Sequence, residues 1–352
     1  MELLDCIVIG GGQSGLYTAK CLAEKNLEYL LLERNRVGDV WRNRLANMKL
    51  FTSRQFCALP GMAFDGDPGG FSSVGEVADY LESYAQGFDL NIRDATEVVS
   101  VTRHGENFMV ATADGVEFTA RSIVNATGSN QVCIVPEIAN RLSDEVVQYT
   151  ADTHEFDRVP EGCRVVVVGD GASGRQIAAL LNGRGEKVTL STGTSRGLPP
   201  NTVFGRDIFW WLKKLGILFA DRNSIVAKIL RKRNPVPCGE FNNKRLRKRG
   251  IRIRGATLSC SGNELRFECG HSEKADVVVW AVGYRDNVDW LKIDKCVAEG
   301  EFIQEYGVTP EPGLFVVGRK WQSCRASELI MGVERDVRMV VDKLSRYLEV
   351  GN

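Results

Sequence analysis

The sequence lacks an excess of charge of either sign. Lys plus Arg and Asp plus Glu number 45 each in 352 residues, so net charge does not favour a nucleic-acid partner. It also lacks a long apolar run, because no stretch approaches the roughly 20 residues that cross a bilayer. No leader is visible, since the apolar run Cys6–Ile9 leads directly into glycines. We expect a cytoplasmic protein without stable membrane insertion.

The ten cysteines include no CxxC pair, which argues against a vicinal redox dithiol and a zinc knuckle. Cys260, Cys269 and His271 form a loose trio without a fourth ligand, so we predict no metal site. Isolated thiols pack as small hydrophobic residues, and so many of them fit a reducing compartment.

A strand–glycine–helix unit is present near the start of the chain. Strand-like runs at Cys6–Ile9 and Tyr29–Leu32 flank the sequence GGGQSG and a helical apolar stripe. The glycines permit a tight turn, approach of a pyrophosphate and close helix packing, and the helix N-terminus attracts phosphate. Glu33 ends the second strand, where a carboxylate accepts hydrogen bonds from ribose hydroxyls and repels a 2′-phosphate. The predicted binding residues are Gly10, Gly12, Gln13, Ser14, Gly15 and Glu33, and the predicted ligand is FAD.

A second unit of the same kind follows in the middle of the chain. The run Val165–Val168 leads into GDGASG, and Val188–Leu190 is its next strand. No acid follows that strand, and hydroxyls and a guanidinium stand there instead. This set favours NADPH, with NADH as the alternative if Arg196 is only a solvated loop residue. The predicted binding residues are Gly169, Gly171, Ser173, Gly174, Ser191, Thr192 and Arg196.

The order of these units predicts that one domain is inserted into another. The strand-and-glycine segments Ser122–Ser129 and Asp276–Arg285 bracket the second unit. We therefore predict an α/β fold of two Rossmann-like domains, with FAD bound by residues 1–155 and 281–352 and NAD(P)H by residues 156–280. A long helix is expected from Glu328 to Leu348.

A basic helical segment lies between residues 205 and 250. A membrane-surface or nucleic-acid patch is one interpretation. A solvated helix face with Trp210, Trp211 and Leu212 turned inward is the favoured one, because charge runs usually face water.

Taken together, the motifs resemble the class B flavin-containing monooxygenases, in particular the compact bacterial members and the plant YUCCA-like enzymes. The resemblance covers nearly the whole chain in the family's order. It is carried by GGGQSG, VGDVWRNR at Val37–Arg44, LFTSRQFCALPGM at Leu50–Met62, GDGASG, the segment Asp276–Arg285 and SELIMGV at Ser327–Val333.

The resemblance implies FAD in the outer domain and NADPH in the inserted one. It further implies oxygenation of a small organic substrate at a nitrogen, sulfur or ketone centre by O₂, through a C4a-(hydro)peroxyflavin. By motif, the further cofactor-binding residues are Trp41, Arg42, Val98, Val99, Thr127, Gly128, Gly318 and Ser327. The oligomeric state is left open, with a homodimer as one alternative.

The chain departs from the family pattern at several positions. Tyr149 and Thr153 replace a His and an aromatic residue of the interdomain fingerprint, and an Asn of larger relatives is replaced around Phe51. No general base is evident, and Thr52 and Arg54 are the only catalytic candidates. An NAD(P)H-dependent flavin reductase or oxidase without oxygen insertion is therefore the alternative function. A disulfide reductase would need the missing cysteine pair, and a non-catalytic redox sensor that retains FAD is a further alternative.

Overall fold

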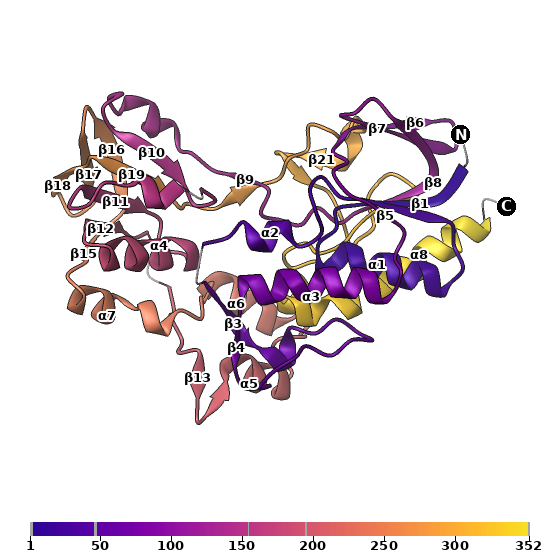
Figure 1. Ribbon diagram of the computed structural model, residues 1–352, viewed down its shortest axis with the longest axis horizontal. Helices are drawn as coiled ribbons and strands as arrows, with labels where there is room; N and C mark the ends of the chain where they lie inside the picture. Colours follow the sequence, from indigo (N-terminus) through magenta and orange to yellow (C-terminus); the bar gives the residue numbers. More distant parts are fainter. Residues whose placement is uncertain (1–2, 46–47, 154, 194–195, 351–352) are drawn as a thin grey trace.

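The computed structural model describes residues 3–45, 48–153, 155–193 and 196–350. Two α/β lobes lie at the two ends of the long axis, and a group of short elements projects between them (Figure 1). The first lobe contains both chain ends and the second contains the middle of the sequence. The predicted α/β class with two Rossmann-like units is confirmed.

The first lobe is built on a seven-stranded sheet in the order β5-β2-β1-β8-β7-β6, with β23 beside the carboxyl half of β8. Strands β5, β2, β1, β8 and β23 are parallel, and β6–β8 form an antiparallel meander. The strands are β1 (Leu3–Ile9), β2 (Tyr29–Leu32), β5 (Ile92–Arg93), β6 (Val98–His104), β7 (Asn107–Thr112), β8 (Glu117–Asn125) and β23 (Leu314–Val316). The long helices are α1 (Gln13–Glu24), α3 (Val74–Gly87) and α8 (Val333–Val350). Their apolar faces bury Leu22, Leu81 and Val341 with β1 in one core.

The second lobe is built on a parallel five-stranded sheet in the order β10-β19-β11-β12-β15. Its strands are β10 (Val147–Thr150), β11 (Arg164–Val168), β12 (Lys187–Ser191), β15 (Arg252–Arg254) and β19 (Val277–Trp280). Helices α4 (Ala172–Gly183) and α7 (Asn243–Lys248) cover one face. A small sheet of β16 (Thr257–Ser261), β17 (Glu264–Phe267) and β18 (Ser272–Lys274) covers the other. The central strands are apolar because they are buried on both faces.

The two lobes are joined by the antiparallel pair β9 (Val132–Cys133) and β20 (Tyr284–Arg285), which lies between them in Figure 1. The chain therefore leaves the first lobe near residue 132, and the predicted boundary at 155 is too late. The short strand β10 belongs to the second sheet because it pairs with β19. Its sequence VQYT has no uniform apolar character, which makes it easy to mistake for a linker.

The elements between the lobes pack on the first lobe, although they lie in the range 156–280. They are β13 (Thr202–Val203), β14 (Arg206–Asp207), α5 (Ile208–Lys214) and α6 (Ile225–Arg233). Phe209 and Leu218 share a buried cluster with Phe56 and Ala326 of the first lobe. The predicted inward packing is confirmed for Trp210 and Leu212, since both contact this cluster. Trp211 lies outside the cluster, and its indole N–H donates to the Val203 carbonyl at 3.0 Å.

The remaining elements are short. Helix α2 (Asp39–Arg42) leads toward the paired strands β3 (Lys49–Ser53) and β4 (Phe71–Ser73), and β21 (Val297–Ala298) pairs with β22 (Glu301–Phe302). The 3-10 helices are Arg54–Phe56, Glu137–Arg141, Glu155–Arg158, Gly239–Phe241, Asp294–Cys296, Arg325–Glu328 and Ile330–Gly332. The last two replace the start of the helix that was expected from Glu328, so α8 begins only at Val333. Among the described residues, no helix is both long and apolar enough to cross a membrane.

Candidate functional site

The first glycine loop follows β1 and leads directly into α1. Gly10 has φ +105°, and a Cβ there would lie 2.9 Å from the Ala126 carbonyl oxygen. A Cβ on Gly15 would lie 1.9 Å from the Gly10 carbonyl oxygen. A Cβ on Gly12, in contrast, would meet nothing within 4 Å. The protein itself requires Gly10 and Gly15, whereas the space over Gly12 is open to a ligand.

The N-terminus of α1 has no side-chain cap, so its first N–H groups are free for an anion. The turn after β23 closes over it: a Cβ on Gly318 would lie 2.6 Å from the Ser14 Oγ. The predicted residues Gly12, Gln13, Ser14 and Gly318 therefore meet at one place. This cradle fits a pyrophosphate.

Glu33 lies at the end of β2, beside this loop, and is 7% exposed. Its Oε2 accepts a hydrogen bond from the Gly11 N–H at 2.6 Å, and its Oε1 accepts one from the Asn35 N–H at 3.0 Å. Each carboxylate oxygen has a further lone pair that can accept a ribose hydroxyl. The carboxylate is thus oriented by the backbone before any nucleotide binds.

The predicted adenine-side residues follow a segment that contacts Glu33. The Thr96 N–H donates to the Glu33 carbonyl, and the Glu33 N–H donates to the Arg93 carbonyl. Val98, two positions further on, packs into a buried cluster of the first lobe, whereas Val99 is 44% exposed. Of the two, Val99 is the more exposed.

Trp41 and Arg42 on α2 have different surroundings. The Trp41 indole N–H donates to the Gln13 Oε1 at 3.4 Å, which links α2 to the first glycine loop. Both terminal nitrogens of Arg42 are committed, with Glu82 at 2.7 Å and Asp79 at 3.2 Å among the partners. Arg42 therefore anchors α2 to α3, and this pairing does not support its predicted flavin contact.

The turn after β8 borders the same loop. The Thr127 N–H and hydroxyl both donate to the Asn125 Oδ1, and the Gly128 carbonyl accepts from Arg319. The Asn125 Nδ2 is buried and has no partner among the described residues. Ser327 lies in a 3-10 helix, where its Oγ accepts the Ser323 and Cys324 N–H groups. Ser327 thus holds its own turn together, whereas the Asn125 amide is an unsatisfied donor near Gly10.

The second glycine loop repeats the first in the other lobe. Gly169 has φ +111°, and a Cβ there would lie 2.2 Å from the Ala281 carbonyl oxygen. A Cβ on Gly174 would lie 1.9 Å from the Gly169 carbonyl oxygen, while one on Gly171 would meet nothing within 4 Å. Ser173 lies in the first turn of α4, which also lacks a side-chain cap. This is a second anion cradle of the same construction.

The residues at and after the end of β12 that were predicted to bind NADPH have other partners in the structure. The Ser191 hydroxyl donates to the Gly255 carbonyl at 3.0 Å, and the Thr192 hydroxyl donates to the Arg254 carbonyl at 2.8 Å. Each hydroxyl has one hydrogen to donate, and a backbone carbonyl already accepts it. Arg196 lies 3.4 Å from the Asp170 Oδ1, and its buried Nε has no partner among the described residues. Of the three predicted residues at this end of the loop, only Arg196 keeps a donor without a partner among the described residues.

Asp170 was not identified from the sequence as a site residue. It is 5% exposed and also pairs with the buried Arg175 at 3.2 Å. A carboxylate inside a phosphate loop repels an anion, and the two guanidiniums offset that charge. No spacing rule identifies such a pair, because Arg196 meets Asp170 only through tertiary structure.

The two catalytic candidates are engaged elsewhere. The Thr52 side chain is 8% exposed, and its Oγ1 lies 3.5 Å from the Cys57 Sγ. Arg54 pairs with Glu76 at 2.5 Å and donates to the Asp65 carbonyl at 3.1 Å. Glu76 is part of the capping box of α3, so Arg54 stabilises that helix. Neither side chain is available as an acid or base.

Arg44, which the sequence did not single out, lies near the junction of the lobes. Its guanidinium stacks 4.4 Å above the Trp41 ring, and no described acid is within ion-pair distance. Burial lowers the pKa of Arg44, partly offset by the neighbouring Tyr284. Burial in turn raises the pKa of Tyr284, on the connecting strand β20, to about 12. An uncompensated cation therefore lies beside the connection between the two lobes.

Comparisons with known proteins agree with this geometry. Residues 7–203 match the model of a family described as pyridine nucleotide-disulphide oxidoreductase. The chain is 37% identical over 349 residues to a protein of Geobacillus kaustophilus (strain HTA426) named uncharacterized oxidoreductase CzcO-like, covering 98% of this chain and 99% of that protein. It is 29% identical over 359 residues to the probable indole-3-pyruvate monooxygenase YUCCA8 of Arabidopsis thaliana, covering 89% and 83% of the two chains.

Among solved structures, the fold is similar to that of a flavin-containing monooxygenase from Stenotrophomonas maltophilia. The TM-score is 0.80 at 24% identity, and 99% of each chain is covered. This likeness extends over both lobes.

Proposed function

The chain belongs to the pyridine nucleotide-disulphide oxidoreductase family and is a class B flavin monooxygenase-like oxidoreductase. From this premise we propose that it is an FAD- and NADPH-dependent monooxygenase that acts on a small organic molecule. The observation that carries the proposal is the pair of glycine loops. Each follows a parallel strand, leaves open space at one glycine and leads into an uncapped helix. Two such cradles in two connected lobes suit a flavin and a nicotinamide cofactor.

FAD is assigned to the first lobe because of Glu33. Its carboxylate is fixed by two backbone N–H groups and can still accept both ribose hydroxyls. It would repel a 2′-phosphate, so this pocket suits an adenosine without one. The residues that would hold the diphosphate are Gly12, Gln13 and Ser14, and the unsatisfied Asn125 amide supplies a further donor nearby.

NADPH is assigned to the second lobe, where Gly171 and Ser173 would hold the diphosphate. Recognition of the 2′-phosphate rests on Arg196, because the Ser191 and Thr192 hydroxyls donate to backbone carbonyls. The Asp170 carboxylate competes for the same guanidinium. NADH is therefore expected to compete with NADPH, with a modest preference for NADPH.

With FAD held in the first lobe and NADPH in the second, the two cofactors would supply the electrons for O₂ to oxygenate a nitrogen, sulfur or ketone centre, with the second oxygen atom released as water. The side chains of this chain contribute binding and orientation. Trp41 and Arg44 pack together beside the connection between the lobes, where they would exclude water from the nucleotides. Thr52 and Arg54 are assigned no proton transfer, because their partners are Cys57 and Glu76.

The test is a stopped-flow experiment on the purified, flavin-loaded protein. We expect NADPH to bleach the flavin, and O₂ then to produce a transient near-UV band before the oxidised spectrum returns. With a panel of amines, sulfides and ketones, at least one compound should yield an oxygenated product in proportion to NADPH consumed. Direct return to oxidised flavin, with one hydrogen peroxide formed for each NADPH oxidised across the whole panel, contradicts the monooxygenase proposal.

That same outcome would support the second candidate, a flavin reductase or oxidase. The observation that favours it is the altered interdomain fingerprint. Tyr149 lies on β10, and its ring packs edge-on against Phe156 at 6.0 Å inside the second lobe. It is partly buried against the core of that lobe, and the family's His is missing from this position.

A further inference from the structure

The elements between the lobes expose several large apolar side chains within a short stretch of chain. Phe204, at the tip of the β13–β14 hairpin, is 90% exposed, and Leu215, just after α5, is 67% exposed. On α6, Ile225 is 77% exposed and Ile229 is 48% exposed. Single exposed apolar residues are ordinary, but several within one short stretch of chain are typical of a contact surface. We call residues 204–233 the hairpin surface.

The same stretch is strongly basic in a chain with no net charge. Residues 201–237 contain two acids, Asp207 and Asp221, and eight cations: Arg206, Lys213, Lys214, Arg222, Lys228, Arg231, Lys232 and Arg233. Asp207 is buried and accepts the Ser53 N–H, and Asp221 accepts the Tyr306 hydroxyl. No described acid lies within ion-pair distance of the exposed cations of α5 and α6. No described carboxylate therefore compensates these charges, although Arg231 lies 4.7 Å above the Trp321 ring and Lys214 lies 4.8 Å above the Trp210 ring.

Apolar and basic side chains share one face of α6. Ile225, Lys228, Ile229 and Lys232 follow the i, i+3, i+4, i+7 spacing of a single helix face, and all four are exposed. The opposite side carries the buried Ala227. Leu230 lines a small apolar pocket of about 40 Å³ together with Leu212 of α5, which shows that the two helices pack together. The outer face of α6 is therefore exposed and has no partner among the residues that the structure describes.

We propose that the hairpin surface docks on an anionic lipid bilayer. Phe204, Ile225 and Ile229 would enter the boundary between headgroups and acyl chains, and the flanking cations would contact lipid phosphates. An occupant must offer both negative charge and an apolar interior. A second copy of this surface would bring like charges together, and a nucleic acid offers no site for isoleucine. In Figure 1 the β13 hairpin projects away from both lobes, which leaves it accessible to a flat surface.

The first experiment is co-sedimentation of the flavin-loaded full-length protein with vesicles. Vesicles of phosphatidylcholine with phosphatidylglycerol are compared with vesicles of phosphatidylcholine alone, at low and at high salt. We expect binding to the anionic vesicles only, weakened by salt because the cations are exposed.

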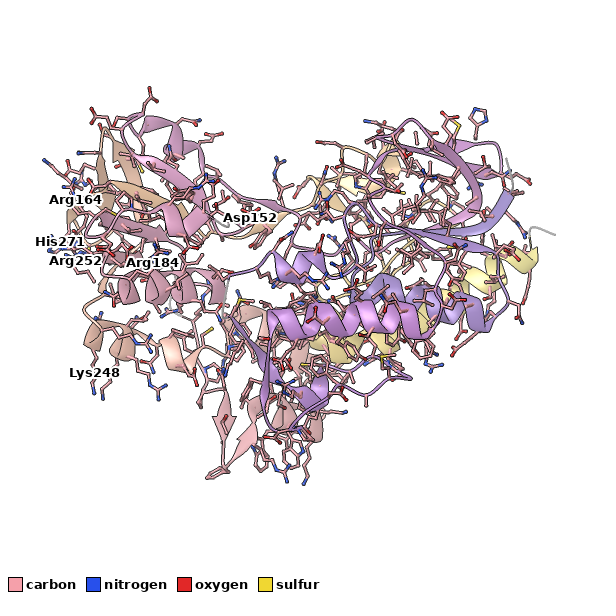
Figure 2. The ribbon with its side chains drawn as sticks, in the orientation of Figure 1. Asp152, Arg164, Arg184, Lys248, Arg252 and His271 are labelled. Carbon is pink, nitrogen blue, oxygen red and sulfur yellow. The ribbon has the colours of Figure 1, made fainter. Side chains whose placement is uncertain are left out.

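Two variants separate the apolar and the charged contributions. Replacing Lys228, Arg231 and Lys232 by serine should weaken binding about 100-fold, at about 1 kcal/mol for each cation. Replacing Phe204, Ile225 and Ile229 by serine should weaken it more than about tenfold. The matched control replaces Lys244, Arg247 and Lys248 of α7, on the far lobe where Figure 2 labels Lys248, and should bind as the wild type does. All variants should keep the flavin and its reduction by NADPH.

Four results would overturn the proposal: no binding to anionic vesicles, equal binding to phosphatidylcholine alone, an equal loss in the α7 control, or an unchanged Phe204/Ile225/Ile229 variant. Gel filtration adds a further test. If the apolar substitutions convert a dimer into a monomer, the surface is an interface between copies of this chain.

Discussion

Replacing Gly12 or Gly171 by alanine separates the space that a nucleotide needs from the space that the protein needs. Their φ values are −77° and −66°, which alanine adopts freely, and a Cβ would meet nothing within 4 Å at either position. Alanine is a weaker N-cap than glycine, but it also restricts the unfolded chain by about 0.4–1 kcal/mol, and the two effects oppose each other. We therefore expect both apoproteins to unfold close to the wild-type temperature.

Each substitution should strongly weaken the binding of one nucleotide and leave the binding of the other unchanged. A methyl group over the loop keeps a diphosphate away from at least two backbone N–H groups, each worth about 1.5–3 kcal/mol to a charged acceptor. Gly12→Ala should weaken FAD binding at least about 100-fold and leave NADP⁺ binding unchanged, and Gly171→Ala should do the reverse. Fluorescence titration of apoprotein with FAD and calorimetry with NADP⁺ measure the two affinities.

Gly15→Ala is the matched control, because its Cβ would lie 1.9 Å from the Gly10 carbonyl oxygen. This variant should lower the unfolding temperature of the apoprotein itself. The reasoning is refuted if Gly12→Ala binds FAD as the wild type does, or if each of the two variants loses both nucleotides.

Further predictions concern single side chains. Glu33→Gln puts an amide where two N–H donors converge, so it should weaken FAD binding at least about tenfold in the same titration. An unchanged affinity would remove the basis for placing FAD in the first lobe. Arg196→Ala should raise KM for NADPH about tenfold more than KM for NADH, and an equal change in both would exclude a 2′-phosphate contact. Backbone and side-chain hydrogen bonds from Ser73 and the ion pair with Arg54 lower the pKa of Glu76 to about 2. Its contribution to stability is therefore present above about pH 4.5 and lost as the pH falls toward 2. Because Glu76 is half-exposed, this contribution to the free energy of unfolding is under about 1 kcal/mol. The urea unfolding midpoints of the wild type and of Glu76→Gln should therefore converge at low pH. A difference between the midpoints that stays constant with pH would contradict this assignment.

The glycine loops made the two nucleotide-binding units predictable from sequence. Strand Tyr29–Leu32 has its predicted bounds, and the run Val165–Val168 lies within β11. Glycines at fixed offsets and fully apolar strands are local signals, so they can be recognised without knowledge of the tertiary structure. β10 was missed because a short mixed edge strand has no such signal.

The partners of polar side chains could not be predicted. Arg42 is bound by Asp79 and Glu82, nearly 40 positions away, and Arg54 is bound by Glu76. Only tertiary packing brings these groups together. The hydroxyl of Ser191 was correctly placed at the end of β12, but its donor is used by the Gly255 carbonyl. Residue type and spacing therefore located the cradles without showing which side chains in them were free.

Counting bound nucleotides tests the central claim most directly. Equilibrium dialysis of the purified chain against FAD and NADP⁺ together should give one of each per chain, and excess NADP⁺ should displace no FAD. One nucleotide in total, or mutual displacement of the two, would contradict the assignment of a flavin to the Glu33 lobe and a nicotinamide cofactor to the Arg196 lobe.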